Sequence, residues 1–184
     1  MREEFKLKPI SREAIPRAIQ KAERYRLINQ SWAAESICRD ILEIDPANQQ
    51  VLVMFVLALT DQLVDGFGHA MKTVRETLPR ITDPYQRAYY TGIASERSGQ
   101  ALLHRGGMGS GAMAYDALRE AMGWYERAEA IRPQGNDDAI LRWNTCARLI
   151  SATATWLRNR KTPTNPPWRI DAIRRQGSTA FSAG

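Results

Sequence analysis

Ala34-Glu-Ser-Ile-Cys38-Arg-Asp-Ile41-Leu-Glu-Ile-Asp-Pro46 is the stretch that decides the fold, because its spacing occurs twice in the chain. The second copy consists of Ala121, Tyr125, Ala128 and Pro133, at the same intervals as Ala34, Cys38, Ile41 and Pro46. Both copies run in the order small, bulky, small, and both close a helical pattern with proline. A packing unit that is used again is the mark of a helical repeat protein.

The composition is that of an ordinary globular domain, with 184 residues, 43% of them hydrophobic and 25% charged. The longest apolar run, residues 51–59, is far shorter than the roughly 20 residues that cross a bilayer, and the first residues show no secretory signal. We therefore expect one cytoplasmic domain without membrane insertion. Cys38 and Cys146 are too far apart for a disulfide framework or a metal spacing, so we expect buried, structural thiols.

The net charge of +6 is concentrated at one end of the chain. Residues 151–184 hold most of it, in the form of Arg158, Arg160, Lys161, Arg169, Arg174 and Arg175 against Asp171. The rest of the chain is nearly neutral. Only this basic tail could make phosphate contacts, so the body does not have the charge of a nucleic-acid-binding face.

Apolar residues at helical spacing predict seven helices and no sheet. The expected ranges are Ser11–Asn29, Trp32–Leu42, Pro46–Leu63, His69–Arg80, Pro84–His104, Ala112–Ile131 and Ala139–Asn159. Asp45-Pro46 and Asp83-Pro84 are predicted helix starts, with aspartate as the cap and proline at the first position. Residues 106–111, Gly-Gly-Met-Gly-Ser-Gly, predict a flexible connector rather than a phosphate loop, since no lysine follows and no strand precedes them.

These helices, and the prolines and turns between them, resemble the tetratricopeptide repeat, a helix-turn-helix unit of about 34 residues. Ala22 and Tyr25, followed by the first copy of the spacing, fall at the intervals of that family, and Trp143 and Ala147 begin a further unit after the second copy. Ala18 and Lys21 depart from the tryptophan and leucine of the family pattern. The resemblance implies an all-α, right-handed superhelix of about seven antiparallel helices over residues 13–160. A lead of residues 1–12 precedes it, and a Pro-rich, basic tail of residues 161–184 follows it.

In that family the first helix of each repeat lines a concave groove that holds a peptide or a partner's helix. Carried onto this chain, the inner-face positions give the expected ligand-binding residues: Glu23, Arg26, Val53, Met54, Leu57, Asp61, Thr91, Ser95, Ser98, Leu141, Arg142, Thr145 and Arg148. The clamp that some members use for acidic C-termini is disfavoured, because Ile19 and Glu23 stand where it needs lysine and asparagine. Arg142 and Arg148 could still meet a carboxylate.

No catalytic constellation is present in the sequence, so we expect no enzyme, no cofactor and no metal site. His69 and His104 have no ligand partners at metal spacing, and no nucleophile motif occurs. The leading hypothesis is a protein-binding module that acts as an adaptor, assembly factor or chaperone-like protein. The alternatives are a nucleic-acid-associated protein that uses the basic tail, whose Trp168 and Ile173 could instead pack on the last hairpin, and a structural role through homo-oligomers.

Overall fold

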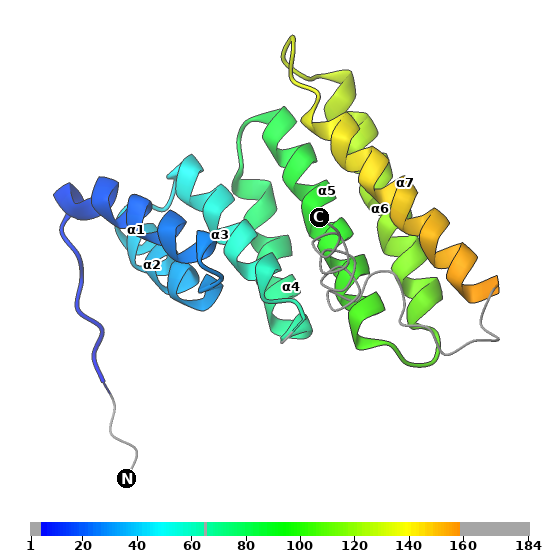
Figure 1. Ribbon diagram of the computed structural model, residues 1–184. Coiled ribbons are helices and arrows are strands. Elements are labelled where there is room, and N and C mark those ends of the chain that lie inside the picture. Colours follow the sequence, from blue (N-terminus) through cyan, green and yellow to red (C-terminus); the bar gives the residue numbers. More distant parts are fainter. Residues whose placement is uncertain (1–4, 65, 159–184) are drawn as a thin grey trace, which may run out of the picture. The chain divides into compact units, whose positions relative to one another are not determined.

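The computed structural model describes residues 5–64 and 66–158, and every regular element among them is helical, as the sequence predicts. Contacts within the chain group it into two compact units, residues 1–83 and 84–184. Figure 1 shows the helices of both units, and each unit is described by itself. The finer predictions, a superhelix and a single repeat domain over 13–160, stay predictions.

The first unit consists of two helical hairpins. Its elements are η1 (Arg12–Ala14), α1 (Ile15–Leu27), α2 (Ser31–Ile44), α3 (Gln49–Asp61), α4 (Phe67–Thr77) and η2 (Leu78–Arg80). Each helix packs on the next, and α1 also touches α3. Pro79 lacks an amide hydrogen, so the α-helix stops at Thr77 and a short 3-10 turn follows it. The single helix predicted over 69–80 is therefore two elements, α4 and η2.

The second unit is a long hairpin followed by a third helix. It contains α5 (Pro84–Arg105), α6 (Ser110–Ala130) and α7 (Asp138–Arg158), and α6 packs against both of the others. The connector between α5 and α6 is shorter than predicted, because α6 already begins at Ser110. Gly106, Gly107 and Gly109 all have positive φ, between 67° and 101°, a conformation that side-chain-bearing residues rarely adopt.

The predicted start of the third helix at Asp45-Pro46 is wrong by three residues. α3 begins at Gln49, and its cap is Asn48, whose side-chain oxygen accepts a hydrogen bond from the backbone N–H of Val51 at 3.1 Å. The Asn48 side-chain amide donates in turn to the Asp45 carboxylate at 2.9 Å. Asp45 therefore orients the capping side chain instead of capping the helix itself.

We expect Asn48→Ala to lower the free energy of unfolding by about 1 kcal/mol, because one N-terminal amide of α3 loses its acceptor. Urea unfolding followed by circular dichroism measures the change. Gln50→Ala is the control, since Gln50 is exposed and lies in the same first turn. An equal loss in both variants would contradict the role of Asn48 as the cap.

Both cysteines are buried in the helical core, as predicted, with no exposed surface. Burial, reinforced by the carboxylates of Glu35 and Glu96, raises the pKa of Cys38 and of Cys146 to about 12. The folded thiols thus keep their protons above the pKa of about 8.5 expected for an unfolded cysteine. The stabilisation that the protonated thiols contribute is therefore fully present below about pH 8.5 and is lost as the pH rises toward 12.

Native protein at pH 8 is therefore expected to react with a thiol reagent such as dithionitrobenzoate only through unfolding. The measurement is the absorbance of the released thiolate in buffer and in guanidinium chloride. The two thiols of the chain should react at least about 100-fold faster in denaturant, because only an accessible thiolate attacks the reagent. Rapid reaction of either cysteine in the native protein would contradict its burial.

None of the helices that the structure describes is both long and apolar enough to span a membrane.

Candidate functional site

Helices α1 and α3 bring together two of the residues predicted to line a binding groove. Arg26 Nε on α1 lies 2.7 Å from Asp61 Oδ2 on α3, and about a quarter of each side chain is exposed. Ser31 at the start of α2 adds its hydroxyl at 3.5 Å from the same carboxylate oxygen. Arg26 and Asp61 thus form a partly exposed ion pair with each other.

The remaining predicted residues of the first unit differ in exposure. Glu23 is exposed on α1, Leu57 is half-buried on α3, and Met54 is buried with 7% of its surface exposed. Of these three residues, Met54 belongs to the hydrophobic core, whereas Glu23 and Leu57 have surface that a partner could contact.

In the second unit a buried carboxylate, Glu96 on α5, joins all three helices. The Tyr125 hydroxyl on α6 donates to Glu96 Oε2 at 2.6 Å. Glu96 Oε1 accepts from Gln100 Nε2 at 3.0 Å and from Arg142 Nη1 on α7 at 3.4 Å. The Cys146 thiol, also on α7, donates to the same carboxylate. Glu96 has no exposed surface, and a buried carboxylate is tolerated only when partners of this kind surround it.

The guanidinium of Arg142, a predicted ligand-binding residue, is therefore oriented by contacts within the second unit. Burial alone would lower the pKa of its guanidinium, but the Glu96 carboxylate and the hydroxyls of Tyr125 and Tyr89 raise it above the ordinary value. The same carboxylate adds to the effect of burial in raising the pKa of Tyr125. One third of the Arg142 side chain stays exposed, so a fixed cation faces outward beside α5.

Two tyrosines of α5 lie on the side of the helix that faces α7. The rings of Tyr85 and Tyr89 stack, with centroids 5.9 Å apart and planes at 12°. The Tyr85 hydroxyl donates to Asn136 Oδ1 at 3.1 Å, and Arg142 hydrogen-bonds Tyr89. The same Asn136 oxygen accepts from the Asp138 amide at 3.0 Å, so Asn136 acts at the start of the last helix. We call Tyr85, Tyr89 and Arg142 the tyrosine–arginine surface.

The other predicted residues of the second unit offer less for recognition. The Thr91 and Thr145 hydroxyls donate to carbonyls of their own helices, those of Arg87 and Leu141, at 2.7 and 3.0 Å. Ser95 is buried, with 8% of its surface exposed, and Arg148 is exposed on α7. Arg148 is therefore a predicted residue that a partner could reach, and it lies six residues beyond Arg142 along α7.

Glu96 and the two tyrosines were missed by the sequence analysis, although a signal for Glu96 existed. It occupies the helical stripe of Ala88, Gly92, Gly99 and Leu103, whose other members are small or apolar and all buried. A lone glutamate on such a stripe must find partners on the neighbouring helices. The identity of those partners, Tyr125 and Arg142, depends on helix register, which one sequence does not provide.

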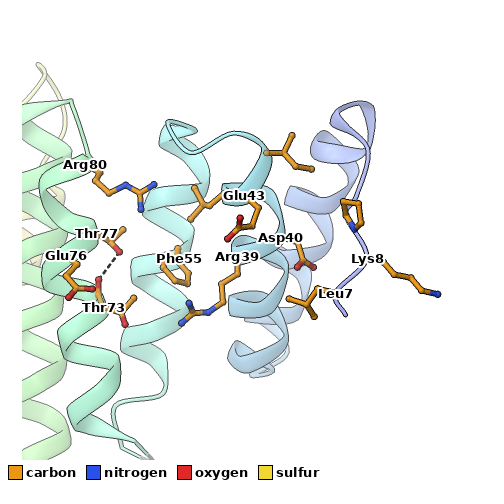
Figure 2. A pocket seen from close by; sticks show the side chains of 13 residues that line it. Leu7, Lys8, Arg39, Asp40, Glu43, Phe55, Thr73, Glu76, Thr77 and Arg80 are labelled. Carbon is orange, nitrogen blue, oxygen red and sulfur yellow. Dashed lines mark hydrogen bonds between the residues drawn. The ribbon is translucent and has the colours of Figure 1, made fainter. Parts of the chain in front are cut away.

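A cavity of about 720 Å³ in the first unit was not expected either. Figure 2 shows it between α2 and α4 over the ring of Phe55, with Leu7 and Lys8 of the lead at one end. Its two arginines are already engaged. Arg39 Nη2 lies 2.7 Å from Glu35 with its guanidinium 5.1 Å from the Phe55 ring, and Arg80 Nη2 donates to the Pro46 carbonyl at 2.7 Å.

The rest of that lining mixes both charges. Asp40, Glu43 and Glu76 contribute carboxylates, and Lys8 contributes an ammonium group. Because equal numbers of cations and anions line the cavity, its charge selects no class of ligand.

Two further predictions concern metal binding and the basic tail. In residues 5–64 and 66–158 no group of three or more His, Cys, Asp or Glu side chains could hold a metal ion. The basic tail, 161–184, with Trp168 and Ile173, lies outside the described residues.

Comparison with models of known families, with characterised proteins and with solved structures gives no match for this chain. The tetratricopeptide resemblance therefore still depends on the residue spacing alone.

Proposed function

We propose that this chain is a cytoplasmic, non-enzymatic protein-binding module of tetratricopeptide-like, superhelical architecture, which docks a peptide segment or helix of its partner on the inner faces of its first helices. It would serve as an adaptor, assembly factor or chaperone-like protein. The observation that carries the proposal is the tyrosine–arginine surface, in which a guanidinium with one third of its side chain exposed is fixed beside two stacked tyrosine rings.

Tyrosine and arginine are the residue types in which binding energy concentrates at protein interfaces. A rigid ring loses little conformational entropy on binding, and a guanidinium that is already oriented loses less than a free one. Glu96 and Tyr89 hold Arg142 before any partner arrives. Its remaining N–H groups suit a carboxylate or a row of backbone carbonyls, and the flanking rings suit apolar or aromatic side chains.

The first unit supports the same proposal with different chemistry. Leu57 offers apolar surface on α3, and the Arg26–Asp61 pair offers both charges nearby. A partner segment that binds there needs an apolar side chain and can hydrogen-bond either member of the pair.

The test is a peptide array probed with the full chain, followed by calorimetry on each peptide that binds. Leu57→Asp and Arg148→Glu should each weaken binding at least tenfold if their faces make the contact. Arg119→Glu on α6 is the matched control, because Arg119 is exposed and belongs to neither face.

Arg142→Glu is measured as well, with its fold checked by circular dichroism, since the new carboxylate would face Glu96. Absence of any bound peptide, or binding that ignores both Leu57→Asp and Arg148→Glu, would overturn the proposal.

A further inference from the structure

The outward flank of α1 is a second surface with its own chemistry, separate from the faces used in the proposed function. Its inner side, with Ile15, Ile19 and Ala22, is buried in the first unit. The flank itself bears a shallow groove of about 640 Å³, lined only by η1, α1 and the residue after it. Its members are Ala14, Arg17, Ala18, Gln20, Lys21, Arg24, Tyr25 and Ile28.

The charged members of this flank are all cations and carry no ion pair. No carboxylate of the described residues lies within salt-bridge distance of Arg17, Lys21 or Arg24, and all three are exposed. Lys21 only rests over the ring of Tyr25, 5.9 Å from its centroid. Arg26, on another side of the same helix, is by contrast paired with Asp61.

The uncharged members form a seam of helical spacing. Ala14, Ala18, Tyr25 and Ile28, with Lys21 between them, follow intervals of four and three residues, the repeat that faces a partner helix in paired helices. The small side chains at Ala14 and Ala18 let another backbone approach, and 56% of Ile28 is exposed. Arg17 and Arg24 lie beside this seam, at positions where charge selects a partner, and Lys21 adds a third cation within the seam itself.

We propose that the outward flank of α1 docks an amphipathic helix of a partner protein, with small or apolar residues on its seam and acidic residues beside it. The three cations, which form no salt bridge with a carboxylate of the described residues, favour an anionic partner, and the four-three seam favours a helical one. A second copy of the same flank is disfavoured, since it would place like charges opposite each other. Insertion of α1 into a membrane is disfavoured because its apolar face is already buried.

The probe is a fluorescein-labelled synthetic helix of about three heptads, with leucine and alanine on the seam and glutamate on the flanks. A matched peptide carries lysine in place of glutamate. Fluorescence anisotropy with the full chain should show binding of the glutamate peptide, weakened by added salt. The lysine peptide should not bind.

Arg17→Glu/Lys21→Glu should weaken binding of the glutamate peptide at least tenfold and should let the lysine peptide bind. Lys72→Glu/Arg75→Glu on α4 is the control, because it makes the same change of charge in the same unit at exposed positions. Circular dichroism should show an intact fold in both variants.

Three results would overturn the proposal. The first is equal loss, or no loss, in the two double variants. The second is binding of single-stranded DNA or of phosphatidylserine vesicles through Arg17 and Lys21 in place of the peptide. The third is self-association, seen by sedimentation, that Arg17→Glu/Lys21→Glu abolishes. None of these results depends on Leu57 or Arg148, so this surface and the proposed function can fail separately.

Discussion

Arg142→Met is expected to lower the free energy of unfolding by about 3 kcal/mol, since it removes the guanidinium that pairs with the buried carboxylate of Glu96. Glu96 would keep its hydrogen bonds from Tyr125 and Gln100, but its charge would be uncompensated. The value lies at the lower end of the usual range because a third of Arg142 is exposed and partly solvated. Urea unfolding followed by tryptophan fluorescence measures it, with Arg119→Met on α6 as the exposed control.

The double variant Glu96→Gln/Arg142→Met distinguishes lost charge balance from lost packing. A neutral glutamine can still accept the Tyr125 hydroxyl, so we expect the double variant to regain at least about half of the stability lost in Arg142→Met. If the two single losses simply add, the ion pair does not account for the role of Arg142. Such a result would also remove the argument that Glu96 holds the tyrosine–arginine surface.

Gly92→Ala is expected to cost about 2–3 kcal/mol, because α5 and α6 are already in contact at Gly92. A Cβ atom there would lie 2.5 Å from Tyr125 Cε1, and Tyr125 is completely buried. Either the ring moves and weakens its hydrogen bond to Glu96, or the two helices separate. Thermal and urea unfolding of the variant measure the cost.

The control for that variant is the same substitution on α6 at Gly123, where a Cβ atom would meet nothing within 4 Å. There alanine should stabilise the protein by up to about 1 kcal/mol, because it favours the helix over the unfolded chain. The two changes are chemically identical, so opposite signs isolate the contact with Tyr125. A loss at both positions would contradict this explanation.

Helical periodicity predicted the number and order of the helices, because each helix has a buried stripe that repeats every three to four residues. The ends were harder to predict. At Asp45-Pro46 two good cap signals lie three residues apart, and the choice of Asn48 depends on side-chain geometry that the sequence does not show. The predicted end of α4 was wrong for a simpler reason. Pro79 ends the α-helix, and the prediction extended the helix past this proline.

The candidate site was predictable only in part. Helical offsets placed Arg26 and Asp61 on one face, and their side chains meet at 2.7 Å. Arg142 was selected as a ligand for a partner's carboxylate, whereas in the structure Glu96 of the same unit already holds it. Contacts of that kind depend on the register of three helices at once, and repeat spacing fixes register only within one hairpin.

The buried carboxylate of Glu96 also has a consequence for folding. Apolar contacts between helices have no preferred partner atom, so they specify helix register less strictly than hydrogen bonds to a buried charge do. Glu96 accepts hydrogen bonds from both α6 and α7, and a slip of either helix would leave a charge without partners. Helices α5 to α7 should therefore open together as one cooperative segment, with amide hydrogen exchange around Glu96, Tyr125 and Arg142 occurring at a common, slow rate.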